Sequence, residues 1–391
     1  MRGIVLAGGS NDKMSVLTGG TSKTFLSLMG RKLFYYPLRN TLSLVDEIAI
    51  VVNNDNEANK AWNYIPENLR KKVRIIVQRE EGIEEAILSC KDYITEEWFL
   101  LSFGDIIMPR EAFSIIYSTF REWKRPIALV TPSSYIETYG VVRIVGSSII
   151  EIYEKPEERL EISHVLGGVF ILPKEIFSLI EQHGDFIGAL NEMAQDMGLW
   201  ASLWTGDWID VGYPWDLISA FYVLANRLHD KIISKDAIVS PTAIIEGPVI
   251  VEEGAIIDHY AVIKGPVYIG RNVFVGKGSF IREYSSIEEG AVVGAHSEIK
   301  RSVLQPYSTV GSFSLVNDSV LGSKSVVEPR VTVLSDLREK GEYKRPLPLQ
   351  GIVARKRKLG VILENGGRIK ANSVVGPAIT IFKDGKIEEI V

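Results

Sequence analysis

The sequence contains very little cysteine. Its 391 residues include one, Cys90, which excludes a disulfide within the chain. Cys90 ends the helix-like stretch 85–90, and we interpret it as part of a hydrophobic core. No apolar run approaches the roughly 20 residues that a membrane helix needs. The short apolar stretch 3–7 leads directly into glycines, unlike a signal peptide. We therefore expect a soluble, cytoplasmic protein with no membrane partner.

The chain also lacks an excess of positive charge. Lys and Arg total 44 against 49 for Asp and Glu, which gives a net charge of −5. A negatively charged protein repels nucleic acid, so we expect no nucleic-acid partner, and an anionic ligand would need a local cluster of cations. The apolar share of 46% and the charged share of 24% are ordinary for globular proteins and exclude wholesale disorder. The length predicts two domains.

Up to about residue 225, short β-branched runs alternate with helical patterns. This alternation is typical of a sheet flanked by helices. The strand candidates are 48–52, 73–77, 98–101 and 127–130, and the helix candidates are 34–44 and 57–69. A further helix is predicted over 214–229, where it would join two domains. We expect an α/β domain over residues 1–230 and a second domain over residues 231–391.

The second part of the chain has a period of six residues. Eleven branched aliphatic residues recur at every sixth position: Val239, Ile245, Val251, Ile257, Ile263, Ile269, Val275, Ile281, Ile287, Val293 and Ile299. A small residue or a valine stands two places before each of them. Because six residues make one short strand and one corner, three such units complete a triangular coil. The period therefore predicts a left-handed parallel β-helix of hexapeptide repeats, with the aliphatic residues inside.

The six-residue period is interrupted after Ile299. We place the next interior residues at Leu315, Leu321, Val327 and Val333, and a last group at Leu363, Ile369, Val375 and Ile381. Between these groups, residues 341–358 form a polar excursion that ends in the basic run Arg355-Lys356-Arg357-Lys358. We interpret this run as a solvated loop, with a former site for coenzyme A phosphates as the alternative. His259 and His296 fall on corners, and we interpret both as surface residues.

A further strand is predicted at the N-terminus, and it ends in a glycine-rich turn. The turn comprises Leu6, Ala7, Gly8 and Gly9. Lys13 and Lys23 come after it. Backbone N–H groups in such a turn can approach phosphates closely, and the two lysines add positive charge for a triphosphate. The turn is not a P-loop, because Leu17 and Ser22 stand where glycines are required. It is not a dinucleotide fingerprint either, because Ser10 replaces the second glycine.

Five further short motifs follow along the chain. They are Phe103-Gly104-Asp105, Tyr139-Gly140-Val141, Glu154-Lys155-Pro156, Leu166-Gly167-Gly168-Val169 and Trp208-Ile209-Asp210-Val211-Gly212. In this order and at these separations, the first 230 residues or so resemble the sugar-phosphate nucleotidylyltransferases, also called nucleoside-diphosphate-sugar pyrophosphorylases. With the hexapeptide repeats, the chain resembles archaeal bifunctional glucosamine-1-phosphate uridylyltransferase/acetyltransferase-like proteins. The resemblance implies a Rossmann-like nucleotidyltransferase domain, with a mixed sheet between two helical layers, ahead of the β-helix.

The resemblance also implies the reaction, in which an NTP and a sugar 1-phosphate form an NDP-sugar and pyrophosphate. A phosphate oxygen attacks the α-phosphorus in line, so the protein mainly positions two anions and neutralises charge. By the same resemblance, Asp105 and Asp210 hold Mg²⁺. The other implied contacts are to the NTP (Leu6, Ala7, Gly8, Gly9, Lys13, Lys23, Gln78 and Gly82) and to the sugar 1-phosphate (Gly140, Glu154, Lys155 and Gly168).

Ordinary structural roles remain as alternatives for several of these residues. Asp105 can be explained as a loop cap and Asp210 as a turn residue. Lys155, followed by a proline, can be a solvated strand end, and Gln78 a surface amide.

The sequence departs from the family pattern in several places. Asn11, Lys13 and Ser22 replace a glycine, an arginine and a proline of the signature loop, and Lys13 lacks the planar fork that binds pyrophosphate bidentately. Ile83 and Leu166 replace residues that read the base and the sugar, so the identity of both substrates stays open. These departures favour slower catalysis and keep a second hypothesis, a catalytically impaired paralogue that regulates or scaffolds an active enzyme.

Acetyl transfer by the β-helix is a third hypothesis. Bifunctional relatives use a histidine as general base, but the corresponding stretch 312–318 has none, and the family's downstream asparagine is replaced near Ser335. Because a serine cannot replace imidazole as a base at neutral pH, we expect no acetyltransferase activity of the usual kind. The β-helix would then serve stability and assembly, and we expect a homo-oligomer, a trimer by analogy.

Overall fold

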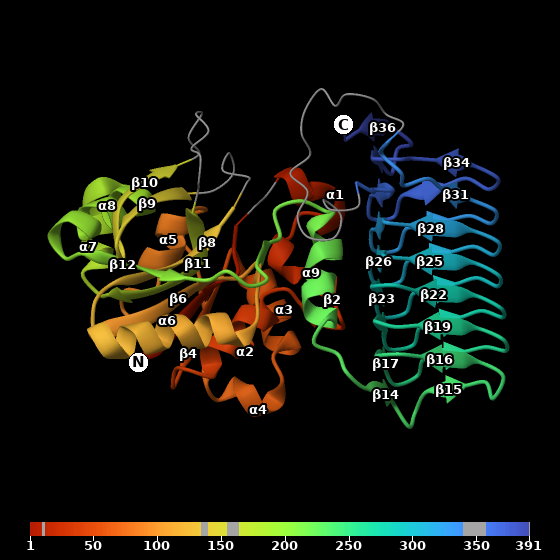
Figure 1. Cartoon of the computed structure of the whole chain (residues 1–391), viewed down its shortest axis with the longest axis horizontal. Helices are drawn as coiled ribbons and strands as arrows, with labels where there is room; N and C mark the ends of the chain where they lie inside the picture. The colour runs from red at the N-terminus through yellow and green to blue at the C-terminus, as the bar shows by residue number, and fades with distance from the viewer. Residues whose placement is uncertain (10–11, 134–139, 155–163, 339–356, 391) are drawn as a thin grey trace. The chain divides into compact units, whose positions relative to one another are not determined.

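The computed structural model describes residues 1–9, 12–133, 140–154, 164–338 and 357–390 (Figure 1). The chain forms two compact units. The first, which we call the α/β unit, comprises Met1–Ser10, Thr21–Phe25 and Leu33–Asp210. The second, the β-helix unit, comprises Asn11–Gly20, Leu26–Lys32 and Val211–Val391. Two short segments of the N-terminal sequence therefore belong to the β-helix unit.

A nine-stranded mixed sheet forms the centre of the α/β unit. In sheet order, its strands are β5 (Val73–Val77), β4 (Ile48–Val52), β1 (Arg2–Leu6), β6 (Trp98–Phe103), β11 (His164–Pro173), β8 (Ile127–Pro132), β12 (Leu199–Leu203), β10 (Ser148–Glu154) and β9 (Gly140–Val145). The first four strands are mutually parallel, whereas β11 runs antiparallel to β6 and β8. The predicted mixed sheet is confirmed.

Helices cover both faces of this sheet. One face carries α2 (Tyr35–Leu42), α3 (Asp55–Tyr64) and α6 (Arg110–Trp123), and the other carries α5 (Ile83–Leu88), α7 (Ile176–His183) and α8 (Phe186–Asp196). Alternate residues of β1 point to opposite faces, with Ile4 and Leu6 in one core and Val5 in the other. The α/β unit thus has the sheet flanked by helices that the alternation of patterns predicts, in the Rossmann-like arrangement that the resemblance implies.

The helix predicted over 57–69 is wrong as a single element. The structure has α3 (Asp55–Tyr64) and then α4 (Glu67–Arg70). Ile65 between them is extended, with φ −78° and ψ 123°. The cause is Pro66, whose ring disfavours helical backbone at the preceding residue.

Three parallel sheets make up the β-helix. The first contains β14 (Lys231–Ile233), β17 (Val249–Val251), β20 (Val267–Ile269), β23 (Ser285–Ile287), β26 (Val303–Leu304), β29 (Val320–Leu321), β32 (Val361–Leu363) and β35 (Ile379–Ile381), with β36 (Ile387–Glu389) added antiparallel. The second contains β15 (Ile238–Val239), β18 (Ile256–Ile257), β21 (Phe274–Val275), β24 (Val292–Val293), β27 (Thr309–Val310), β30 (Val326–Val327) and β33 (Arg368–Ile369). The third contains β16 (Ile244–Glu246), β19 (Val262–Lys264), β22 (Phe280–Arg282), β25 (Glu298–Lys300), β28 (Leu315–Asn317), β31 (Thr332–Val333) and β34 (Val374–Val375).

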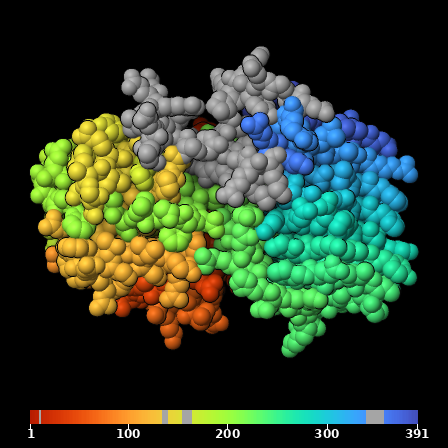
Figure 2. Space-filling view, in the orientation of Figure 1, coloured from red at the N-terminus to blue at the C-terminus, as the bar shows by residue number. Residues whose placement is uncertain are grey.

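The coils of the β-helix stack in sequence order, from green to blue in Figures 1 and 2. Its core consists of aliphatic side chains at the predicted hexad positions, such as Ile263, Ile281 and Val293. The left-handed β-helix predicted from the period is confirmed.

One predicted interior position is wrong. The core residue near the interruption is Val316, which is buried, and not Leu315. Ile287 pairs with Leu304 and Ile299 with Val316, so these neighbouring coils are 17 residues apart. The interior positions therefore advance by five residues, instead of six, from Ile299 to Leu304.

The remaining elements of the β-helix unit come from three parts of the sequence. Near the N-terminus lie the 3-10 turn Asp12–Met14, the helix α1 (Ser15–Thr18) and the hairpin of β2 (Ser27–Leu28) and β3 (Arg31–Lys32). Helix α9 (Asp216–Ala225) lies within the predicted range 214–229. The rings of Tyr222 on α9 and Tyr284 are 4.6 Å apart, so α9 packs on the β-helix.

Several single-residue predictions are also settled. Cys90 is fully buried in the core of the α/β unit, and burial raises the pKa of its thiol to about 12. His259 and His296 are exposed, as predicted. Arg355 and Lys356 lie outside the described residues, as do Ser10 and Asn11. Among the helices of the described residues, none is long and apolar enough to cross a membrane.

Candidate active site

The candidate site lies at one edge of the mixed sheet. Strands β1, β4, β5 and β6 are parallel neighbours, so their carboxyl ends meet at the same edge. Gly8, Asn53, Gln78 and Asp105 follow these four strands. In open α/β sheets, this edge is where ligands bind.

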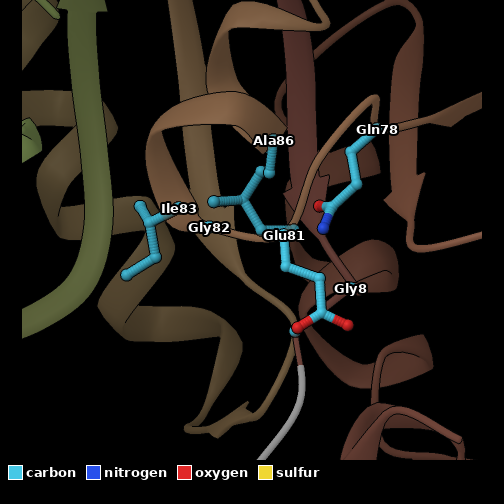
Figure 3. Close-up of a pocket in the computed structure, with 8 residues that line it drawn as sticks. Gly8, Gln78, Glu81, Gly82, Ile83 and Ala86 are labelled. Carbon is cyan, nitrogen blue, oxygen red and sulfur yellow. The ribbon is translucent and has the colours of Figure 1, made fainter. Parts of the chain in front are cut away.

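A cavity of about 330 Å³ opens at this edge. It is lined by Leu6, Gly8, Gly9, Gln78, Glu81, Gly82, Ile83 and Ala86. In the close-up view, Ile83 lies on the far side of the cavity from Gln78 (Figure 3). Five of the six residues predicted to bind the nucleotide through the turn or the base line this cavity, and the sixth, Ala7, does not.

Gln78 is held in a defined position at the cavity. Its side chain is buried, and its Nε2 donates a hydrogen bond of 3.0 Å to Asn53 Oδ1. Among the described residues, the buried Oε1 has no hydrogen-bond partner. The alternative of a surface amide is therefore wrong. A buried amide oxygen without a partner is suited to accept a hydrogen bond from a ligand.

Two residues that organise this edge were not predicted from the sequence. Asn53 Oδ1 also accepts the N–H of Gly9 at 2.7 Å, and the buried Glu57 carboxylate accepts the N–H of Asn53 and, at 2.7 Å, the N–H of Ser22. Proline, which the family pattern has at the position of Ser22, could not donate this bond. Asn53 directly follows a predicted strand, as Gln78 does, and that position was the available signal.

The two predicted acidic residues meet at the same edge. Ile106 of β7 (Ile106–Ile107) pairs with Asp210 of β13 (Ile209–Asp210), which places Asp210 opposite the residue that follows Asp105. Lys23 Nζ lies 2.5 Å from Asp105 Oδ2 and 3.9 Å from Asp210 Oδ1. All three side chains are largely buried, with 15–24% exposed. The structure thus brings together three predicted site residues from distant parts of the sequence.

The two carboxylates are a donor set that would fit a magnesium ion whose other ligands are phosphate oxygens and water. Among the described residues, no group of three or more His, Cys, Asp or Glu side chains could hold a metal ion. Asp105 and Asp210 provide two carboxylates around one ammonium group. Mg²⁺ is commonly held by one or two carboxylates together with phosphate oxygens and water, so two carboxylates are sufficient.

Of the predicted sugar-phosphate residues, Gly168 lies next to the strand that follows Asp105. Gly168 has φ +76°, and a Cβ there would lie 2.8 Å from Ile106, the neighbour of Asp105. Gly140 packs against Leu166, where a Cβ would meet the leucine at 3.1 Å, and pairs with Glu154 across β9 and β10. Lys155 lies outside the described residues.

Lys13 belongs to the β-helix unit. Its Nζ donates to Tyr213 Oη at 2.8 Å and lies 4.5 Å from the centre of the Tyr213 ring. The ring of Tyr213 in turn stacks on Trp215 at 4.8 Å. Within its own unit, Lys13 is therefore held by a tyrosine that sequence analysis did not identify.

Two family profiles and several full-length relatives match this chain. The profile of the family described as Nucleotidyl transferase matches residues 2–227, and that of the GMPPB C-terminal domain matches residues 245–337. The bifunctional protein GlmU of Methanocaldococcus jannaschii is 28% identical, over 98% of this chain and 95% of its own length. The bifunctional sugar-1-phosphate nucleotidylyltransferase/acetyltransferase of Sulfurisphaera tokodaii is 27% identical, over 97% and 94%.

Solved structures share the fold of the α/β unit. A UDP-glucose pyrophosphorylase complexed with UDP-glucose superposes with a TM-score of 0.51 and 18% identity, over 58% of this chain and 98% of that one. A UDP-glucose pyrophosphorylase from Acinetobacter baumannii gives a TM-score of 0.50 and 16% identity, over 58% and 94%.

Proposed function

The chain belongs to the nucleotidyl transferase family, and from this premise we propose that it joins a sugar 1-phosphate to a nucleoside triphosphate, forming an NDP-sugar and pyrophosphate. One observation carries the proposal. Lys23, Asp105 and Asp210 converge at the carboxyl edge of the sheet. The cavity lies at the same edge, because Leu6, which lines it, accepts the N–H of Gly104 at 2.8 Å.

The cavity would take the base of the triphosphate. Gln78 Oε1 would accept a hydrogen bond from a base N–H, which would satisfy a buried acceptor that has no partner among the described residues. Gly8 and Gly9 leave room for the nucleotide to approach the backbone, and Gly82 borders the same space. The absence of side chains at these positions suits close contact with a ligand.

The transfer step would require positioning and charge neutralisation. An oxygen of the sugar phosphate forms a bond to the α-phosphorus, and the bond from that phosphorus to the bridging oxygen breaks as pyrophosphate leaves. Asp105 and Asp210 would hold Mg²⁺, which when bound supplies positive charge to the phosphate oxygens. Lys23 would add a second positive charge near the triphosphate, and Lys155 would contact the sugar phosphate, as the resemblance implies.

The names of the full-length relatives support the same substrate class. The M. jannaschii and S. tokodaii proteins are both described as bifunctional, and the second is described as a sugar-1-phosphate nucleotidylyltransferase. The base and the sugar are not part of the proposal, because Ile83 and Leu166 occupy the positions that would select them.

A screen for pyrophosphate release would test the proposal. The common NTPs are combined with several hexose and hexosamine 1-phosphates in the presence of Mg²⁺. We expect turnover with at least one pair, and a loss of at least about 100-fold in kcat for Asp105→Asn, Asp210→Asn and Lys23→Ala.

The matched control is Asp46→Asn, an exposed aspartate that is paired with the N-terminal amine. It should retain turnover. Turnover that persists in both Asp105→Asn and Asp210→Asn would refute the assigned site. If no pair turns over, but the chain binds and changes an active relative, the regulatory hypothesis is correct instead.

We further propose that the β-helix lacks acetyltransferase activity of the usual kind. The support is the absence of histidine from residues 312–318, where bifunctional relatives carry the general base. No free thiol should appear when the chain is given acetyl-CoA and glucosamine 1-phosphate. Release of coenzyme A above the rate without sugar would contradict this.

A homo-oligomer, with a trimer as the expected form, completes the proposal. The second sheet of the β-helix exposes apolar side chains at successive coils, with exposed fractions of 65% for Ile238, 38% for Ile256 and 37% for Phe274. Aligned apolar residues on one face are typical of a surface that another subunit covers. Light scattering coupled to size exclusion should give three times the mass of one chain.

A further inference from the structure

The segment that carries Lys23 is flanked on both sides by stretches that belong to the β-helix unit. Thr21–Phe25 belongs to the α/β unit, whereas Asn11–Gly20 and Leu26–Lys32 belong to the β-helix unit. Each flanking stretch is fastened by hydrogen bonds to side chains of the β-helix. We call these two sets of contacts the loop anchor and the hairpin anchor.

The loop anchor is formed by Asn365. Its backbone N–H donates to the carbonyl of Val16 at 3.0 Å, and its side-chain Nδ2 donates to the carbonyl of Leu17 at 2.7 Å. Its Oδ1 accepts the N–H of Ser323 at 2.7 Å, which fixes the side chain to the β-helix. Carbonyls at the end of a helix need hydrogen-bond donors from outside the helix. Asn365 supplies donors to two such carbonyls of α1.

The hairpin anchor begins with Glu288. Its carboxylate accepts the N–H of Met29 at 2.8 Å and the N–H of Gly30 at 2.9 Å, both in the turn of the β2–β3 hairpin. Ser286 donates its hydroxyl to the same carboxylate at 2.5 Å. The side chain is buried, and burial raises the pKa of the carboxyl group while these three donors act in the opposite direction.

Gln305 and Tyr268 complete the hairpin anchor. The Gln305 amide accepts the N–H of Ser27 at 3.1 Å and donates to the carbonyl of Ser27 at 2.8 Å. The Tyr268 hydroxyl fills the space at Gly30, where an added Cβ would lie 2.1 Å from it. Gln305 and Tyr268 are both buried, so the hairpin is seated in a specific site on the first sheet.

The α/β unit holds the middle of the same segment. Thr24 donates its hydroxyl to the carbonyl of Ala7 at 2.6 Å, and the N–H of Ser22 donates to Glu57. Ser22 and Thr24 are thus held within the α/β unit, and the stretches that precede and follow this five-residue segment in the sequence are held within the β-helix unit. All of these contacts together restrict the positions that the Lys23 ammonium group can take.

We propose that Asn365, Glu288 and Gln305 are positioning residues for nucleotidyl transfer, and that the β-helix is required to hold Lys23 for its work on the triphosphate. The proposal rests on the function proposed above, in which Lys23 contacts the nucleotide phosphates. A displacement of about 1 Å at such a group can cost up to about 100-fold in rate. The anchors therefore act on the nucleotide and leave binding of the sugar phosphate unchanged.

The test uses the full chain with one variant for each anchor. Asn365→Asp keeps an acceptor for the N–H of Ser323 but loses the donor to Leu17. Gln305→Leu keeps the volume in part and loses both bonds to Ser27. The matched control is Ser297→Ala, a buried β-helix serine that donates to the carbonyl of Gly311 at 2.8 Å and accepts the N–H of Ser314.

Steady-state kinetics and amide hydrogen exchange are measured together. In Gln305→Leu we expect faster exchange at Ser27, Met29 and Gly30, a KM for the NTP raised about 10-fold, and an unchanged KM for the sugar 1-phosphate. Asn365→Asp should raise the KM for the NTP in the same way. Ser297→Ala should change none of these values.

The outcomes separate this proposal from the function on which it rests. Faster exchange at the hairpin with unchanged NTP kinetics would overturn the positioning role, and so would equal rises in both KM values. If the unaltered chain shows no turnover, the proposed function is wrong. Calorimetry with MgATP, MgUTP and MgGTP then tests the positioning role of the anchors. Weaker nucleotide binding by Gln305→Leu supports this role, and equal binding overturns it.

Discussion

The candidate site depends on a few residues whose size is constrained by their neighbours. Gly8 stands between Asn53 and Gln78, and Gly104 stands against the backbone of Leu6. The two glycines differ in what surrounds them. Side-chain atoms can move by a few tenths of an ångström, whereas the backbone of a central strand cannot. Substitutions at these two positions should therefore have different effects.

The Gly8→Ala variant should fold normally but bind the nucleotide poorly. Its Cβ would lie 2.7 Å from Asn53 Oδ1 and 2.9 Å from Gln78 Oε1, so both side chains must shift from their positions. We expect the Kd for the preferred NTP to rise about 10-fold, or by about 1.4 kcal/mol. Calorimetric titration checks this value.

Gly104→Ala is the contrasting variant. Its Cβ would lie 2.5 Å from the backbone oxygen of Leu6, so we expect a lower thermal unfolding midpoint. Equal unfolding midpoints and equal NTP affinities for the two variants would contradict this account of the glycines.

Cys90 should be inert towards thiol reagents in the folded protein. Its thiol is fully buried, with a pKa raised to about 12, so the reactive thiolate is scarce at pH 8. Labelling with a disulfide reagent should be negligible in buffer and should reach one thiol per chain after unfolding in guanidinium. Rapid labelling in buffer would show that this part of the core opens readily.

At the scale of elements, the β-helix shows how much a periodic sequence determines. The six-residue repeat predicted the interior positions from Val251 to Ile299, because each aliphatic side chain can be buried only in that register. The repeat does not determine the phase after Ile299, because Leu315 and Val316 are both aliphatic and either of them could be the interior residue. The phase changes because the interior positions advance by five residues at the corner between Ile299 and Leu304. A buried charged residue lies at this corner.

The interior positions also advance by five residues from Val316 to Leu321, one coil after the corner between Ile299 and Leu304. Arg301 lies at the first of these corners and Asp318 at the second. Arg301 donates through Nε and Nη2 to the Asp318 carboxylate, and the two side chains are only 4% and 3% exposed. Arg301→Ala leaves the buried carboxylate without its partner, so we expect a loss of about 3–5 kcal/mol in the free energy of unfolding.

Arg271→Ala is the control, because Arg271 forms an exposed ion pair with Glu253. Its cost should stay below about 1 kcal/mol. Denaturant unfolding monitored by circular dichroism checks both values. Similar costs for the two substitutions would mean that the corner pair contributes no more than a surface pair.

At the scale of the whole molecule, the site residues are easier to predict from the sequence than the contacts that hold them in place. Asp105, Asp210 and Lys23 belong to motifs that were found in the chain, and the structure brings them together. The hairpin anchor joins Ser27 to Gln305, 278 positions apart, and the loop anchor joins Leu17 to Asn365, 348 positions apart. Neither local propensity nor the hexapeptide period contains information about such contacts.

The division of the chain into units has the same origin. The pattern of strands and helices predicted one continuous N-terminal domain, whereas the structure places Asn11–Gly20 and Leu26–Lys32 with the β-helix. These stretches are short and have little periodicity of their own, so their place is set by tertiary hydrogen bonds. The proposed dependence of nucleotide binding on the β-helix follows from that arrangement.

The central claim is direct transfer of a nucleotidyl group to a sugar 1-phosphate at the site of Lys23, Asp105 and Asp210. Exchange of radiolabelled pyrophosphate into the NTP tests it most directly, with the substrate pair that the screen identifies. In-line transfer without a protein nucleophile predicts that label enters the NTP only when the sugar 1-phosphate is present, and that Asp105→Asn abolishes the exchange. Exchange that proceeds without the sugar 1-phosphate, or that survives in Asp105→Asn, would contradict the account.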